Sequence, residues 1–352
     1  MKFRGNPFRP AGENHGPRRF FIFGLALFIA LTVALAGSSV IQAQGATSKK
    51  NPGDPQKRLG DVEKDVMRLQ RHIDLYNLDA LPDNLTLCDR KIPIFRPDIR
   101  ERFERELFQM LENKGLITIV IKRYYKYLPL MSEEIARMGV PSDLIYVAVT
   151  ESYLNPRAVS KASAAGMWQF MKETGKIEGL AVNDCIDDRY NVKKSTHSAL
   201  GHLKKLNGQF NDWLLAMAAY NAGPNRVRDA IENQGTRDFF DMYLPEETER
   251  YIFRILSLKE IIMNRERYGI QIDEKDLYKP ALISEVLIEA KSDFNSLILA
   301  RAMDVSYRTY RINNLHLRKY KLPKGIYRVN VPTEKKDMFI KKIRSYDYIS
   351  VQ

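Results

Sequence analysis

Apolar positions recur at helical spacing through the middle of the chain. The segment IRERFERELFQMLENKG places Ile99, Phe103, Leu107 and Leu111 four residues apart, on one face of a helix. No alternating strand pattern appears between residues 98 and 265. The same spacing predicts further helices in PSDLIYVAVTESYL, STHSALGHLKKLNGQF, DWLLAMAAYNAG and EETERYIFRILSLKEIIMN. The pattern therefore predicts an all-α domain, placed at residues 92–270.

The pattern changes after Pro280. SEVLIEA is typical of a strand, FNSLILARAM and YRTYRINN of short helices, and IYRVNV alternates as a second strand. This β-α-α-β order predicts a small α+β domain at residues 281–333, and we expect residues 334–352 to be a basic tail. The fold class is thus mainly α, with a small α+β domain after the all-α one.

The N-terminus has the pattern of an export signal. Five basic residues precede an uncharged apolar run from Phe20 to Ala36. The segment 1–43 is therefore either a cleaved signal peptide or a signal anchor, because 17 residues are near the lower limit for a membrane span. Residues 44–91 are expected to form a polar linker followed by a short amphipathic helix at 61–80. The expected location is the periplasm or cell envelope.

Composition and charge narrow the class of partner. The chain has 352 residues and a net charge of +13. Residues 1–43 carry +4 and residues 305–352 carry +9, so the body between them is neutral. A basic C-terminal end suits an anionic envelope polymer or lipid. Nucleic acid is not expected as a partner because the export signal removes the chain from it.

The two cysteines leave two alternatives open. In an oxidising compartment Cys88 and Cys185 could form a disulfide, or they could be two buried thiols. They lack the histidine spacing of a zinc site. The sequence calls for no metal and no organic cofactor.

The first candidate for chemistry is Glu151. It lies at the end of the apolar helix DLIYVAVTESYLNP. Apolar surroundings raise the pKa of a carboxyl, so the group stays protonated near neutral pH and can act as a general acid. The loop GMWQF then offers aromatic surface and an amide for a sugar. In AAYNAGPNRV, Tyr220 and Asn221 end a helix, where their polar groups can point into a cleft.

Taken in order, these motifs resemble a known family. The blocks ES..NP.A.S..AAGMWQ, AYNAGPNRV and LPEETERYIFRIL resemble the membrane-bound lytic murein transglycosylase D family, whose SLT catalytic domain is lysozyme-like. The resemblance runs from about Ile92 to Asn264. This chain departs from it in having GMWQ where the family more often has GLMQ or GLWQ, and Tyr190 and Val192 after the Asp-x-Arg element.

The resemblance implies roles for individual residues. Glu151 matches the single catalytic acid/base, and the other matched positions line the substrate cleft. These substrate-binding candidates are Ser152, Ser160, Met167, Gln169, Tyr220, Asn221, Glu247 and Tyr251. Asp184, Asp187 and Asp188 are the nearest candidates for a second carboxylate, and we interpret Asp187 and Arg189 as a structural pair.

The activity that the resemblance implies is cleavage of the β-1,4 bond between N-acetylmuramic acid and N-acetylglucosamine in peptidoglycan, with formation of 1,6-anhydro ends. A hydrolytic lysozyme or chitinase on the same fold would leave reducing ends instead. A catalytically weak peptidoglycan-binding scaffold is the other alternative. The C-terminal domain resembles a degenerate LysM-like module, in which KSDF replaces the usual Gly-Asp-Thr near the first strand.

Overall fold

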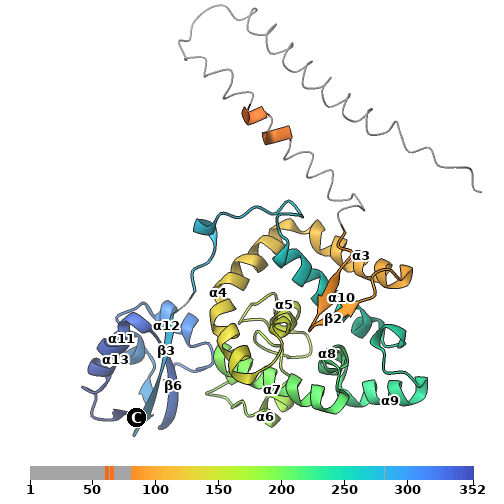
Figure 1. Cartoon of the computed structure of the whole chain (residues 1–352). Coiled ribbons are helices and arrows are strands. Elements are labelled where there is room, and N and C mark those ends of the chain that lie inside the picture. Colours follow the sequence, from red (N-terminus) through yellow and green to blue (C-terminus); the bar gives the residue numbers. More distant parts are fainter. Residues whose placement is uncertain (1–59, 63, 67–80, 281) are drawn as a thin grey trace, which may run out of the picture. The chain divides into compact units, whose positions relative to one another are not determined.

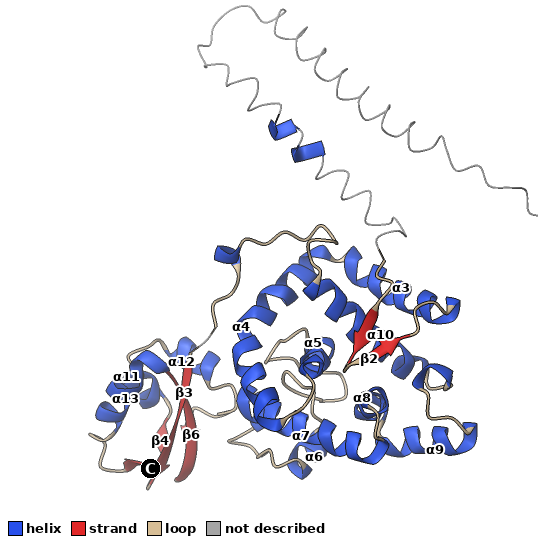
Figure 2. Cartoon of the chain, in the orientation of Figure 1, coloured by secondary structure: helices blue, strands red, loops and turns tan. Residues whose placement is uncertain are grey.

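The computed structural model describes residues 60–62, 64–66, 81–280 and 282–352 (Figures 1 and 2). The predicted export signal and most of the predicted helix at 61–80 lie outside these residues. Within the described part of the chain, no helix combines the length and the apolarity needed to cross a membrane. The described residues from 81 onward belong to one contact unit.

The predicted all-α domain is confirmed as a set of packed helices. Each helix expected from the apolar spacing is present, and the four apolar positions of the first one are all buried. Its helices are α3 (Pro97–Glu112), α4 (Lys114–Met138), α5 (Ile145–Ser152), α6 (Lys172–Ile177), α7 (Val192–Phe210), α8 (Trp213–Ala222), α9 (Pro224–Gln234) and α10 (Glu246–Met263). Single 3₁₀ turns are η3 (Ser142–Leu144), η4 (Asp188–Tyr190) and η5 (Phe239–Asp241).

A short hairpin precedes these helices. Strands β1 (Leu85–Leu87) and β2 (Arg90–Ile92) pair antiparallel, with Leu85 opposite Ile92. Leu85, Leu87 and Ile92 are buried in the same core as the helices. The packed unit therefore begins before residue 92, which was the predicted start of the all-α domain.

Helix α5 lies inside this domain rather than on its surface. Figure 1 shows it enclosed, and it contacts α4 and α10. Its residues Ile145 to Val149 are all buried, which explains why its sequence is apolar on every face. The helix ends where Tyr153 and Leu154 take left-handed backbone angles, with φ of 52° and 53°. Glu151 thus comes from the last turn of a rigid central helix.

The C-terminal module has the predicted β-α-α-β order. Strands β3 and β6 pair antiparallel from Ile283 opposite Pro332 to Ala290 opposite Gly325, and two short helices pack against them. The elements are β3 (Ile283–Ala290), β4 (Phe294–Asn295), α11 (Leu297–Met303), α12 (Tyr307–Asn313), β5 (Lys321–Leu322) and β6 (Gly325–Pro332), with the turn η6 (Glu274–Asp276) before them.

The prediction of a basic tail at 334–352 is wrong. After the turn η7 (Thr333–Lys335), helix α13 (Lys336–Ile343) and strand β7 (Ile349–Val351) belong to the module, and the sheet order is β6-β3-β7. Phe339 and Ile343, one helical turn apart, are fully buried. Their burial stabilises the segment despite its lysines, whose side chains reach solvent.

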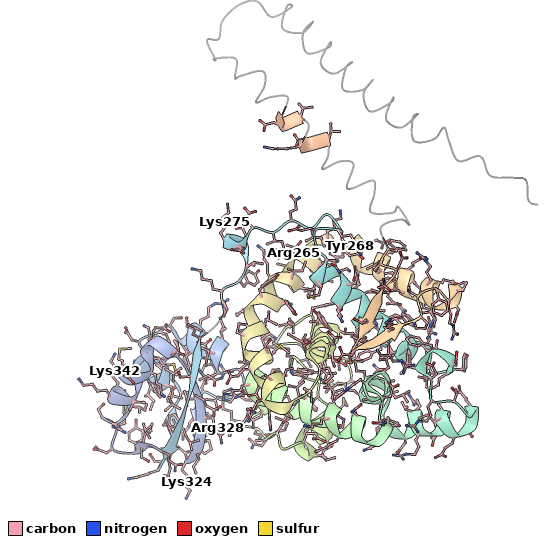
Figure 3. All side chains as sticks on the ribbon, viewed as in Figure 1. Arg265, Tyr268, Lys275, Lys324, Arg328 and Lys342 are labelled. Carbon is pink, nitrogen blue, oxygen red and sulfur yellow. The ribbon has the colours of Figure 1, made fainter. Side chains whose placement is uncertain are left out.

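The positive charge of the module is therefore spread over a folded surface. Figure 3 labels Lys324, Arg328 and Lys342, which come from the β5–β6 turn, β6 and α13. Arg328 pairs with Glu285 on the neighbouring strand, with Nη1 2.6 Å from the carboxylate oxygen. The basic side chains described between residues 305 and 352 thus belong to a folded module and not to a disordered tail.

The module is attached to the all-α domain through backbone hydrogen bonds. The Asp187 amide donates to the His316 carbonyl at 2.8 Å, and the Arg318 amide donates to the Cys185 carbonyl at 2.7 Å. Leu317 is fully buried between them, in a β-bridge with Ile186. The loop before α7 is therefore shared by both domains.

Candidate active site

Glu151 lies half-buried at the end of α5, and its environment favours the neutral acid. The pKa of its carboxyl is raised from 4.5 to about 7, mainly by burial and to a smaller extent by the nearby charge of Glu247. The Tyr251 hydroxyl, which donates to Oε1 at 2.7 Å, and the charge of Arg254 act in the opposite direction. A carboxyl with a pKa near 7 can donate a proton and later accept one at neutral pH.

The Tyr251 contact predicts a directional change in the pH profile. In Tyr251→Phe the carboxylate loses a donor, so the Glu151 pKa rises and the basic limb of kcat/KM moves to higher pH. We also expect kcat to fall about tenfold, because a charge-assisted hydrogen bond is lost. Steady-state kinetics on peptidoglycan between pH 5 and 9 measures both effects.

A matched control is available at the end of the same helix. The hydroxyl of Tyr268, five residues after α10, donates to Glu260 at 3.0 Å, and neither residue is among the groups that shift the Glu151 pKa. Tyr268→Phe should leave the profile unchanged. A basic limb in Tyr251→Phe that stays in place, or moves to lower pH, would contradict the assigned contact.

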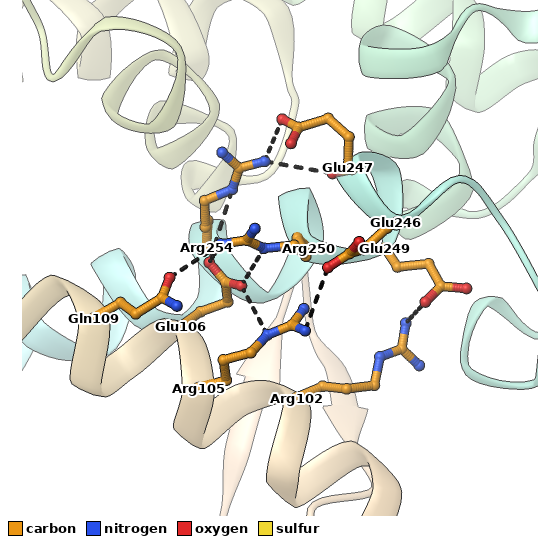
Figure 4. Close-up of polar contacts among 9 residues, drawn as sticks. All are labelled: Arg102, Arg105, Glu106, Gln109, Glu246, Glu247, Glu249, Arg250 and Arg254. Carbon is orange, nitrogen blue, oxygen red and sulfur yellow. Dashed lines mark hydrogen bonds and ion pairs between the residues drawn. The ribbon is translucent and has the colours of Figure 1, made fainter.

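A cluster of charges connects α10 to α3 beside this site (Figure 4). Glu106 on α3 has a side chain that is 0% exposed and pairs with Arg250 at 2.7 Å and Arg105 at 3.3 Å. Arg254 lies 4.0 Å from the same carboxylate and also pairs with Glu247. The cluster therefore fixes Arg254, one of the charges that sets the Glu151 pKa.

The sequence analysis missed Glu106 and Arg254. Arg254 lies three residues after Tyr251 and seven after Glu247, so one face of α10 carries all three, and this spacing is readable from the sequence. Glu106 gives no such signal, because its main partner is 144 residues away.

The loop after α5 is tied to the helix end by predicted site residues. The Ser152 hydroxyl is buried and donates to the Met167 carbonyl at 2.7 Å. The side-chain amide of Gln169 donates from Nε2 to the Gly166 carbonyl at 2.7 Å. Ser160 is exposed, and its hydroxyl accepts the Ala164 amide at 3.0 Å. Ser152 thus holds the loop against the end of α5, whereas Ser160 lies on the part of the loop that is exposed to solvent.

Gly166 is the residue at which this loop passes very close to the backbone of Arg189. Its φ is 79°, and a Cβ added there would lie 1.8 Å from the Arg189 carbonyl oxygen. Gly166→Ala is therefore expected to lower the free energy of unfolding by about 2–3 kcal/mol, measured by urea denaturation. Gly208→Ala is the control, since its Cβ meets nothing within 4 Å in the interior of α7; it should be neutral or slightly stabilising. Equal stability of the two variants would contradict the packing described.

Tyr220 and Asn221 come to the same region from the end of α8. The Tyr220 hydroxyl donates to the Trp168 carbonyl at 2.8 Å, and the Asn221 side-chain oxygen accepts from Thr248 at 3.1 Å. The pKa of Tyr220 is raised well above its usual value by burial and then by the charge of Glu151. The structure thus brings Tyr220, Tyr251 and Glu247 into the surroundings of Glu151.

The three aspartates considered as a second carboxylate are engaged elsewhere. Asp187 makes a bidentate pair with Arg189, with Nε–Oδ1 3.0 Å and Nη2–Oδ2 2.8 Å, in agreement with the predicted structural pair. Arg189 also donates to the Phe170 carbonyl and so holds the loop. Asp188 pairs with Lys194 at 2.6 Å. Asp184 is 90% exposed beside Lys319.

The two cysteines are free and have different environments. Cys88 is buried in the β1–β2 turn, and its amide donates to Asp143 at 2.7 Å. Cys185 packs against the core of the C-terminal module. Separate thiols, rather than a disulfide, are thus the arrangement in this structure, although Cys185 is only partly buried.

Comparison with known proteins shows what the chain is similar to. Residues 130–242 match the family model described as "Transglycosylase SLT domain". This stretch of the chain is therefore similar to a transglycosylase SLT domain. It is 35% identical over 181 residues to membrane-bound lytic murein transglycosylase D of Escherichia coli K12, covering 50% of this chain and 40% of that protein. The predicted resemblance to that family is therefore confirmed, although the chain spans only about two fifths of the relative's length.

Other relatives carry similar names. The peptidoglycan transglycosylase gp16 of phage T7 is 39% identical over 124 residues, covering 34% of this chain and 9% of that protein. Among solved structures, a lytic transglycosylase Slt from Pseudomonas aeruginosa matches at 25% identity with a TM-score of 0.33, covering 44% of this chain and 26% of that one. The 70 kDa soluble enzyme of E. coli matches at 19% identity with a TM-score of 0.36, covering 49% and 32%.

Proposed function

We propose that this chain is a peptidoglycan lytic transglycosylase with Glu151 as its single acid/base. The observation that carries the proposal is a half-buried carboxyl at the end of a rigid apolar helix, with its pKa raised to about 7 and a tyrosine donor on one oxygen. Among the described residues, Glu247 is the only other acid whose charge acts on it, and Glu247 is bound to Arg254.

The chemistry follows from one carboxyl used twice. Protonated Glu151 gives its proton to the oxygen of the β-1,4 bond, and the bond from C1 of the muramic residue to that oxygen breaks. The acetamido group of the muramic residue stabilises the positive charge at C1. The Glu151 carboxylate then accepts the proton of the C6 hydroxyl, whose oxygen bonds to C1. No water is consumed, so the second carboxylate of ordinary glycosidases has no role.

The neighbouring residues have supporting roles in this proposal. Tyr251 orients the Glu151 carboxyl through its hydrogen bond. Tyr220 lies close enough to Glu151 for the two to interact electrostatically. Asn221 and Gln169 are assigned to the sugar cleft on the family resemblance, and the side chain of Met167 is buried. Glu247 holds Arg254 at the edge of the site, and the exposed Ser160 suits contact with a sugar.

The location proposed is the bacterial cell envelope. The basic N-terminal residues and the apolar run from Phe20 to Ala36 support export. The relative from E. coli is named membrane-bound, and an uncleaved signal would give this chain the same association. The proposed partner is the glycan strand of peptidoglycan.

The experiment that tests the activity is digestion of purified peptidoglycan in water enriched in ¹⁸O, with products identified by mass spectrometry. The proposal predicts unlabelled anhydro-muramic ends. Labelled reducing ends would assign the chain to the hydrolytic lysozymes instead. Binding without any cleavage would mean that it is a scaffold.

A further inference from the structure

A cavity lies between the all-α domain and the C-terminal module, and residues 155–157, which follow the helix that carries Glu151, form part of its lining. Its volume is about 300 Å³, at the lower end for small-ligand sites. Helix α4, the loop after α5, the start of α7, and the module's β3, α12 and β6 all contribute to its lining. The backbone hydrogen bonds at His316 and Arg318 hold the two domains together beside it.

The charge of the lining is almost entirely positive. Its cations are Arg123, Lys126, Arg157, Lys193 and Arg308. In the part of the chain that the structure describes, none of these five has a carboxylate within salt-bridge distance. The single acid of the lining, Glu285, is already paired with Arg328.

Two of these cations are half-buried next to each other. Arg123 and Lys126 are three residues apart on α4, so they lie on one face of the helix. The pKa of Lys126 is lowered by burial and then by the charge of Arg123. Two partly desolvated like charges oppose folding unless an anion offsets them. Arg123 also donates to the Tyr153 carbonyl at 3.0 Å, two residues after Glu151.

The remaining lining favours a peptide over a bare inorganic anion. The side-chain amides of Asn155, Asn313 and Asn330 line the cavity. Asn155 Oδ1 accepts from the Arg157 amide and Asn330 Nδ2 donates to the Asn313 carbonyl, so we assign Asn155 Nδ2 and Asn330 Oδ1 to peptide groups. Leu130 and Ile312 add apolar surface that suits methyl groups. A phosphate would use the cations but neither of the other two features.

We propose that this cavity binds the acidic peptide stem that muramic residues of peptidoglycan carry. The inference rests on the proposed function, since the stem reaches the cavity as part of the glycan substrate. The carboxylates of the stem pair with Lys126 and Arg308, one from each domain, and the stem thereby sets the preference for peptide-bearing glycan.

The test uses the full chain and the stem tripeptide alanyl-γ-glutamyl-diaminopimelate, with binding measured by titration calorimetry. The double variant Lys126→Met/Arg308→Gln should weaken binding at least about tenfold, because two charge-assisted contacts are lost. The variant Lys91→Met/Arg344→Gln removes the same charge from exposed positions that make no ion pair; it should bind as the wild type does. The ratio of kcat/KM for peptide-bearing over peptide-free glycan should fall with the first variant only.

Several results would overturn the proposal. They are no binding of the tripeptide, equal binding of its fully amidated form, or equal weakening by both double variants. Binding of inorganic phosphate or glycerol phosphate in place of the tripeptide would assign the cavity to a phosphate ligand. Cleavage of peptide-free glycan is measured separately. If that cleavage occurs but the tripeptide does not bind, the stem site is wrong and the proposed function stands. If the tripeptide binds but no glycan is cleaved, the proposed function is wrong.

Discussion

Replacing Glu151 by glutamine is expected to lower kcat on peptidoglycan by about 10³-fold or more. General acid–base catalysis contributes about 10²–10⁴-fold, and this site uses one carboxyl for both proton transfers. Glutamine keeps the shape and can still accept the Tyr251 hydrogen bond at its amide oxygen, but it can neither give nor take the proton. Release of soluble muropeptides from purified peptidoglycan measures the loss.

The free energy of unfolding of this variant gives an independent check on the Glu151 pKa. Relative to the wild type, it should increase as the pH rises. The folded-state pKa of Glu151 is raised from 4.5 to about 7. Its contribution to folding is therefore fully present below about pH 4.5 and is lost as the pH rises through about 7. At pH 8 Glu151→Gln should gain stability over the wild type, relative to pH 4, by at most about 3 kcal/mol. A variant less stable at pH 8 than at pH 4, relative to the wild type, would show that the carboxylate is not desolvated.

Replacing Glu106 by alanine is expected to lower the free energy of unfolding by about 3–5 kcal/mol. The Glu106 carboxylate is fully buried among Arg105, Arg250 and Arg254, and removing one partner leaves uncompensated buried charge. The same change frees Arg254, whose charge lowers the pKa of Glu151. Urea denaturation measures the stability.

A glutamate that is only partly buried on the same helix is the matched control. Glu104 pairs with Arg100 at 2.9 Å across one helical turn, and its side chain is 22% exposed. Glu104→Ala should cost only about 0.3–0.5 kcal/mol, because helical pairs of this spacing that remain in contact with water contribute little. A loss below about 1 kcal/mol in Glu106→Ala would mean that the cluster is as weak as a surface pair.

The sequence predicted most of the fold because its local patterns are strong. The apolar spacing of Ile99, Phe103 and Leu107 predicts α3, and the uninterrupted apolar run before Glu151 predicts a central helix. The β-α-α-β order of the module also followed from local periodicity. The prediction of a tail at 334–352 was wrong because it rested on the positive charge of the segment. Phe339 and Ile343, which are one helical turn apart and buried, indicate a packed helix instead.

The site was predictable where it depends on short motifs and not where it depends on distant pairs. Glu151 follows from its helix, and Tyr251 comes from a motif of the family resemblance. Glu106 was missed because the arginine that it pairs with comes from a helix 144 residues away, a contact that only the packing of α3 on α10 creates. The cation-lined cavity exists only because the module docks through Leu317, so no local pattern could reveal it.

The most direct test of the account is the pKa of the Glu151 carboxyl itself. Its titration can be followed by ¹³C NMR on protein labelled at the glutamate side-chain carboxyl, with the signal assigned by its absence in Glu151→Gln. We expect a midpoint near pH 7. A midpoint near 4.5, the ordinary value for a solvated glutamate, would contradict the claim that burial prepares this one carboxyl for both proton transfers.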